Sequence, residues 1–310
     1  MSRVTVAVAQ PEAAATLGEA LGKTVDAAQE AASRGAQLVV FPEAWLPGYP
    51  IWLDVCRDVA LWDHAPVKDV FARYSANCVV VGGSETQRLA ALALELSLTI
   101  VIGVSERVTA GPGNGTLYNT LLTFTPDGRL ANHHRKLVPT YTERMVWGPG
   151  DATGLRAVET PCGRVGGLIC WEHWMPLARQ ALHDSGEAIH VAVWPTAHEN
   201  HQLASRHYAF EGRCFVIAAG SIMRASALPP ELERHPGKAP SDAAWVMRGG
   251  SAIIAPNGSY LVGPIFEEAA LLVSEIDLDD VRREQMTLDV SGHYARPDVF
   301  DFSVRRNQTA

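Results

Sequence analysis

Short, nearly continuous apolar runs alternate with polar, helix-periodic segments along most of the 310-residue chain. Runs such as 36–41 (AQLVVF) and 214–222 (CFVIAAGSI) lack the strict alternation of a strand with one face in water. Continuous apolar runs are typical of strands buried on both faces of a sheet. We therefore predict strands at 3–9, 36–41, 99–105, 164–170, 188–195, 214–222 and 270–278.

Two further pairs of apolar runs predict hairpins. The turn PDGR joins the two halves of 117–137, and Asn257-Gly258 joins those of 249–263; Asn-Gly favours a two-residue hairpin turn. Helices are predicted where apolar residues recur every three or four positions. These segments are 16–34, 84–97, 177–185 and 201–213. Strands that alternate with helices indicate an α/β fold in which helices cover one face of each sheet.

The pattern gives no sign of a domain boundary. Residues 226–243 are polar and rich in proline, which predicts a long surface loop. We find no internal repeat and no linker that would separate two domains. We therefore expect one domain over 1–310.

Composition and charge exclude several classes of protein. The net charge is −8 with scattered basic residues, so we expect no nucleic-acid partner. No apolar run reaches the roughly 18 residues of a membrane span, and the N-terminus lacks the long apolar segment of a secretory signal. The five cysteines have no C-x-x-C spacing. An odd number of cysteines in a long chain favours reduced thiols and a cytoplasmic location.

Three polar residues stand where apolar runs end. Glu43 follows LVVFP, Lys136 ends the first hairpin, and Cys170 follows VGGLI. Strand ends are where open α/β sheets build their sites. A thiol, a carboxylate and an ammonium group suit covalent hydrolysis: the thiolate attacks, the carboxylate moves protons, and the cation stabilises negative charge. The cation also favours the thiolate form of the cysteine.

Each of these residues also has an ordinary structural interpretation. A single Glu is more often a carboxylate at a helix start, a single Lys is usually a surface residue, and a Cys after an apolar run is usually an inert core thiol. Spacing alone does not decide between these interpretations and a catalytic site.

The sequence around the three residues favours a catalytic site. FPEAWLPGYP, HRKLVPTYTERMVWGPGD and CWEHWMPLAR resemble, in the same order, the three signature segments of the nitrilase (carbon–nitrogen hydrolase) superfamily. The resemblance implies a four-layer α-β-β-α sandwich, assembled as a homodimer or small homo-oligomer. It also implies that Glu43 is the general base, Lys136 the charge stabiliser and Cys170 the nucleophile. A second carboxylate of the family falls on Glu143. The family needs no cofactor and no metal.

The triplet Cys170-Trp171-Glu172 resembles the true nitrilase branch, which implies a small-molecule nitrile as substrate and a carboxylic acid and ammonia as products. An amidase or N-carbamoyl amide hydrolase with the same triad is the nearest alternative. A catalytically silent scaffold of the same fold is another. A metallohydrolase using His198 and His201 is a third, although a polar helix start explains these histidines better.

Around the nucleophile, Trp171, Tyr49 and Trp194 are candidate substrate-binding pocket walls. The alternative is that Trp171 only packs the turn and that Tyr49 and Trp194 only pack the core. The backbone N–H of Trp171 is placed to donate to a developing negative charge. Glu172 and His173 are expected to hold the turn through hydrogen bonds, since the superfamily mechanism needs no imidazole.

Overall fold

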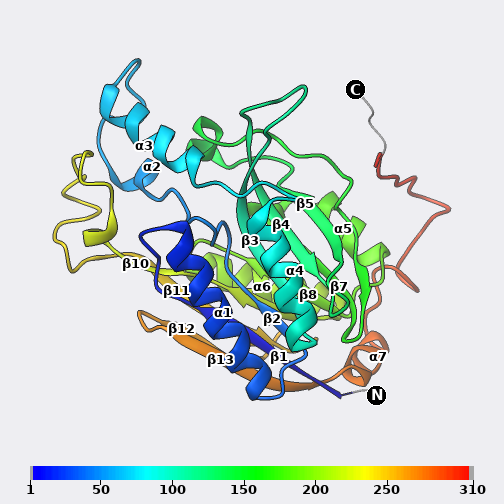
Figure 1. Ribbon diagram of the computed structural model, residues 1–310. Helices are drawn as coiled ribbons and strands as arrows, with labels where there is room; N and C mark the ends of the chain where they lie inside the picture. The colour runs from blue at the N-terminus through cyan, green and yellow to red at the C-terminus, as the bar shows by residue number, and fades with distance from the viewer. Residues whose placement is uncertain (1–2, 307–310) are drawn as a thin grey trace.

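The computed structural model describes residues 3–306, which form two sheets packed face to face (Figure 1). The first sheet has the order β13-β1-β2-β3-β4-β5, and the second has the order β10-β11-β9-β8-β7-β6 with β12 paired to β11. The strands of the first sheet are β1 (Arg3–Gln10), β2 (Leu38–Val40), β3 (Thr99–Arg107), β4 (Leu117–Phe124), β5 (Leu130–Arg135) and β13 (Ala270–Asp277). Those of the second are β6 (Val158–Thr160), β7 (Gly163–Ile169), β8 (Ile189–Val193), β9 (Phe215–Ala219), β10 (Ile222–Arg224), β11 (Trp245–Ile254) and β12 (Tyr260–Phe266).

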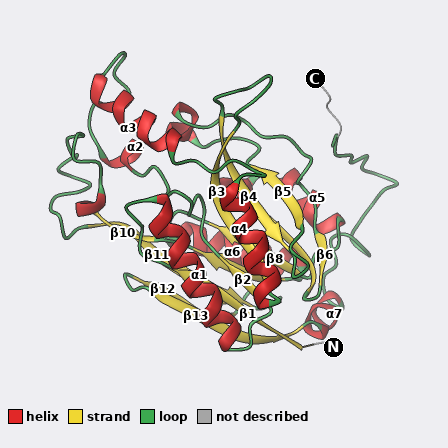
Figure 2. Ribbon diagram, in the orientation of Figure 1, coloured by secondary structure: helices red, strands yellow, loops and turns green. Residues whose placement is uncertain are grey.

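Helices cover the outer face of each sheet, which makes the four layers of an α-β-β-α sandwich (Figure 2). The helices α1 (Leu17–Ser33) and α4 (Ser84–Leu96) lie over the first sheet, and α5 (Pro176–Asp184) and α6 (Glu199–Gly212) cover the second. The strand β1 shows how the sequence builds both layers. Val6 and Val8 belong to the core shared with the second sheet, whereas Ala7 and Ala9 pack with α1 and α4. A strand buried on both faces needs an apolar residue at every position, so the continuous runs are explained.

The elements predicted from periodicity are present with small changes at their ends. The run at 36–41 gives only the three residues of β2, because the chain turns at Pro42, which has no N–H to donate to a ladder. The run at 214–222 is not one strand, since it divides into β9 and β10 around Gly220 and Ser221. Among residues 3–306, no helix is both long enough and apolar enough to cross a bilayer.

Three helices of the structure were not predicted. They are α2 (Trp52–Val55), α3 (Ala65–Ala76) and α7 (Asp279–Gln285). The sequence of α3 does carry the helical pattern, with apolar side chains at Val67, Val70, Phe71 and Tyr74, and the prediction missed it. Only Val70 of this helix is fully buried. The other two helices are too short for a periodic pattern to be recognised.

The fold brings strand ends from both sheets to one place. Glu43 follows β2 and Lys136 follows β5, both in the first sheet, whereas Cys170 follows β7 in the second. A glycine makes room for the first of them. A Cβ atom on Gly103 would lie 2.2 Å from the carbonyl oxygen of Pro42 and 2.7 Å from the Cα of Glu43. Glycine at this position therefore lets β3 pass directly beside the backbone that carries Glu43.

Candidate active site

Cys170 occupies a strained turn directly after β7. It opens a short 3₁₀ helix, Cys170–Trp174, and has a φ of 52°, a left-handed conformation that is rare for a residue with a side chain. Such a conformation persists only where surrounding contacts impose it, and it is concentrated at functional sites. The turn thus directs the thiol away from the path of the strand.

Glu172 and His173 impose this turn. The buried Glu172 carboxylate accepts hydrogen bonds from the backbone N–H groups of Ile169 and Leu137, each at 2.8 Å. His173 donates through Nδ1 to the carbonyl oxygen of Cys170 at 2.7 Å. Burial alone would raise the pKa of Glu172, but His134 and the two N–H groups lower it overall. The structural roles predicted for Glu172 and His173 agree with these contacts.

Glu43 follows β2 and is completely buried. One carboxylate oxygen accepts from Asn119 Nδ2 at 2.7 Å and from Lys136 Nζ at 3.1 Å. The other oxygen has no hydrogen-bond partner within residues 3–306. Burial raises the pKa of Glu43 to about 7, although Lys136 opposes the shift. A carboxylate with this pKa and a free oxygen is suited to take up and release a proton at neutral pH.

Lys136 joins Glu43 to a second carboxylate. Its buried ammonium group donates to Glu43 and to both oxygens of Glu143, at 3.0 and 2.7 Å. Burial would lower the pKa of Lys136, but Glu43, Cys170 and Glu143 raise it well above its ordinary value. Lys136 is therefore a fixed positive charge inside the protein.

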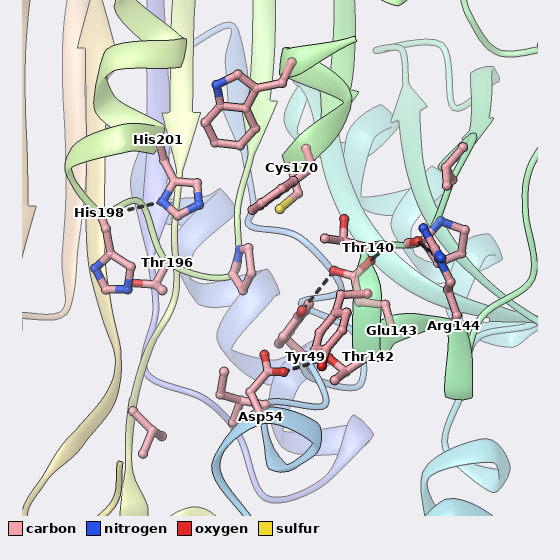
Figure 3. Close-up of a pocket in the computed structure, with 18 of the residues that line it drawn as sticks. Tyr49, Asp54, Thr140, Thr142, Glu143, Arg144, Cys170, Thr196, His198 and His201 are labelled. Atoms are coloured by element: carbon pink, nitrogen blue, oxygen red, sulfur yellow. Dashed lines mark hydrogen bonds between the residues drawn. The ribbon is translucent and has the colours of Figure 1, made fainter. Parts of the chain in front are cut away.

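Glu143 is held by more partners than Glu43. It belongs to a 3₁₀ helix, Tyr141–Met145, and its carboxylate accepts from the N–H of Thr140 at 2.7 Å and from the hydroxyl of Tyr49 at 2.9 Å. Together with Lys136, these contacts fix the Glu143 side chain at the cavity wall (Figure 3).

Both carboxylates and the thiol of the predicted site lie close together. A carboxylate oxygen of Glu43, one of Glu143 and the sulfur of Cys170 all lie within 4.8 Å of one another. Within residues 3–306, these three side chains form the one cluster of potential metal ligands. The ammonium of Lys136 already provides the positive charge between the two carboxylates. The pair His198 and His201 gains no third ligand among residues 3–306.

The protonation state of Cys170 differs from the sequence-based expectation. Burial and the neighbouring Glu43 raise the pKa of the Cys170 thiol well above its ordinary value, while Lys136 lowers it by less. Lys136 favours the thiolate, as expected, but does not outweigh the other two effects. The resting thiol is therefore protonated, and a base must remove its proton for it to attack.

Cys170 and Glu143 open into a cavity of about 920 Å³ (Figure 3). Trp171 and Tyr49 line this cavity, as predicted, and the side chain of Trp171 is half exposed. The prediction for Trp194 is wrong. Its indole is fully buried behind the wall, where it stacks on His173 at a centroid distance of 4.6 Å.

Several residues of the site were not predicted. Asn119 orients Glu43, and its signal was a lone amide within the apolar run LYNTLLTF. Thr142 donates to Asp54 at 2.7 Å on the cavity wall, and this pair could not be foreseen because Asp54 comes from the unpredicted α2. The other lining residues missed are Ile51, Val138, Pro139, Thr140, Tyr141, Arg144, Trp174, Met175, Pro195, Thr196 and Val246.

Known proteins resemble this chain over most of its length. Residues 5–284 match the family described as carbon-nitrogen hydrolase. The chain is 43% identical over 285 residues to an aliphatic nitrilase of Sinorhizobium fredii, covering 91% of this chain and 89% of that protein. It is 40% identical to a bifunctional nitrilase/nitrile hydratase of Lupinus angustifolius, covering 90% of this chain and 79% of that one.

Solved structures support the fold at lower sequence identity. A carbon-nitrogen hydrolase from Helicobacter pylori superposes with a TM-score of 0.74 at 17% identity, covering 96% of this chain and 97% of that one. The NitFhit protein of C. elegans superposes with a TM-score of 0.71 at 16% identity, covering 100% of this chain and 69% of that one. At this level of identity, both similarities support the shared fold alone.

Proposed function

Since the chain belongs to the carbon–nitrogen hydrolase family, we propose that it is a nitrilase, which converts an organic nitrile and two waters into a carboxylic acid and ammonia. The observation that carries the proposal is the cluster of Glu43, Lys136, Glu143 and Cys170, of which Glu143 and Cys170 line a cavity. The similarity to proteins named nitrilases supports a nitrile as the substrate.

The contacts suggest how the first half of the reaction proceeds. Glu43 takes the proton of the Cys170 thiol, and the sulfur adds to the nitrile carbon. The nitrile nitrogen gains that proton, which gives a thioimidate. Glu43 then removes a proton from a water that adds to the same carbon. Lys136 and the backbone N–H of Trp171 stabilise negative charge as each tetrahedral species forms.

The second half divides between two products. If the nitrogen is protonated, ammonia leaves and a thioester remains, which a second water hydrolyses to the acid and the free thiol. If the sulfur leaves first, an amide is released. Lys136 and the two carboxylates control the proton supply at the nitrogen. We therefore propose the acid as the main product and the amide as a minor one.

A panel of nitriles and amides tests this proposal, with acid, amide and ammonia all quantified. We expect acid and ammonia in equal amounts from a good nitrile. Turnover of simple amides with every nitrile left intact would instead assign the site to an amidase.

We further propose a homodimer or small homo-oligomer in the cytoplasm. Exposed apolar side chains on α5 and α6, among them Leu177, Leu203 and Phe210, support an interface on this face. All five cysteines are free, which supports a reducing compartment. Light scattering at assay concentration tests the first point, and a fully active monomer would contradict it.

A further inference from the structure

His201 lies on the wall of the cavity, at the start of α6 and in the segment that follows β8 (Figure 3). The backbone N–H of His198 donates to His201 Nδ1 at 3.0 Å. A backbone N–H can only donate, so Nδ1 must be an acceptor without a proton. The proton of the neutral imidazole is therefore on Nε2. This assignment makes Nε2 a hydrogen-bond donor.

Aromatic neighbours keep the His201 ring in place. The ring packs against Trp194 and Trp174, at centroid distances of 4.8 and 5.6 Å. Trp194 is itself fixed, since its indole N–H donates to Ser205 at 3.2 Å. A ring confined in this way presents its donor without the entropy cost of ordering a flexible side chain.

The donor is neutral and unpaired. Burial, assisted by His198, lowers the pKa of His201 to about 4. No hydrogen bond is made by His201 Nε2 within the described part of the chain. In Figure 3 this nitrogen points toward the side of the cavity on which Cys170 lies. Apolar side chains, including Val138, Met175 and Trp171, make up much of the surrounding wall.

We propose that His201 Nε2–H determines substrate specificity by donating to an uncharged oxygen, such as an ether, hydroxyl or carbonyl oxygen, carried by the nitrile away from its reacting carbon. Because the ring stays neutral at working pH, it recognises a hydrogen-bond acceptor and does not select for an anion. This inference rests on the proposed nitrilase function and names the substrate class of the same site. His201 acts on binding and orientation, and has no part in the covalent steps.

Matched pairs of nitriles test the inference. Each pair has the same chain length, with an ether oxygen in place of one methylene group, and the oxygen moves further from the nitrile along the series. We expect the wild type to favour the ether of at least one pair by about 3- to 10-fold in kcat/KM, which is what one neutral hydrogen bond contributes. No preference at any oxygen position would overturn the inference.

Three variants assign the effect to one atom. His201→Phe keeps a ring against the two tryptophans and should remove the preference while alkyl nitriles are still hydrolysed. His201→Asn can still accept from the His198 N–H but is shorter than the imidazole, so it should also lose the preference. His198→Phe is the matched control, because it changes a second cavity histidine and keeps the backbone N–H.

The outcomes separate this inference from the proposed function. A preference that survives in both His201 variants, or that disappears equally in His198→Phe, excludes His201 as the donor. Failure of the wild type to hydrolyse any nitrile would instead remove the proposed function, and with it the inference.

Discussion

Replacing Lys136 by methionine removes the one ammonium group that separates two buried carboxylates. In the wild type, Nζ lies 3.1 Å from Glu43 and 2.7 Å from Glu143. The two carboxylates come within 4.8 Å of each other. At an effective dielectric constant of about 20, two negative charges at that distance repel by about 3.5 kcal/mol. Without the Lys136 ammonium group between them, one of the two carboxyl groups will hold a proton at neutral pH.

We expect Lys136→Met to lose activity by at least about 10²-fold, because the base is neutralised and the stabilising charge is absent. The unfolding free energy should fall by about 3 kcal/mol, since a buried ion pair is left incomplete. The double variant Lys136→Met/Glu143→Gln removes one charge of each sign. It should recover most of the stability and none of the activity.

Initial rates on a good nitrile and urea unfolding at pH 7 measure both quantities. The reasoning is refuted if Lys136→Met keeps its activity within a few-fold of the wild type. It is equally refuted if the double variant is less stable than Lys136→Met, because the excess buried carboxyl group would then not be the cause of the loss.

Three further outcomes are expected. Cys170→Ala should abolish turnover with an unchanged circular dichroism spectrum. Mass spectrometry of wild type trapped with substrate should find added mass at Cys170 alone. Near-native activity of Cys170→Ala would contradict its assignment as the nucleophile. Glu43 is proposed to act as the carboxylate, and burial raises its pKa to about 7, so kcat/KM should decline as the pH falls below that value. A kcat/KM that stays constant from pH 8 to about pH 5 would exclude Glu43 as the base. Glu172→Gln should lower the unfolding free energy by about 3 kcal/mol at pH 7, measured by urea unfolding. The folded-state pKa of Glu172 is lowered from 4.5, so the stabilisation by its carboxylate is complete above that pH and is lost as the pH falls further. A loss of stability in the variant that does not depend on pH would contradict this ionic role.

The sequence predicted the architecture where apolar runs are long, and the site where polar residues end them. The runs that precede Glu43, Lys136 and Cys170 are visible without a structure because an apolar run and the polar residues that follow it can be read from the sequence pattern, even where the exact strand ends differ. The full burial of Trp194 could not be predicted from the sequence. An indole beside a catalytic segment is apolar enough to line a cavity or to support its wall, and only the packing on His173 decides between them.

The protonation states of the site residues could not be predicted from the sequence either. The raised pKa of the Cys170 thiol depends on burial and on its distance from Glu43, neither of which is encoded in spacing along the chain. The proton on His201 depends on one hydrogen bond from the backbone of His198, which exists only once α6 has formed. Sequence therefore named the chemical groups, and three-dimensional contacts set their protonation states.

The proposed catalytic groups come from both sheets, so activity depends on how the two sheets are docked. Glu43 and Lys136 follow strands of one sheet and Cys170 follows a strand of the other. The Glu172 carboxylate links the two sheets by accepting from the N–H of Leu137, after β5, and from that of Ile169, in β7. A slight slip of one sheet over the other would leave every strand and helix intact and would separate thiol from base. During gentle denaturation, catalysis should therefore disappear before the circular dichroism signal does, since it depends on docking between layers whose secondary structure can outlast it.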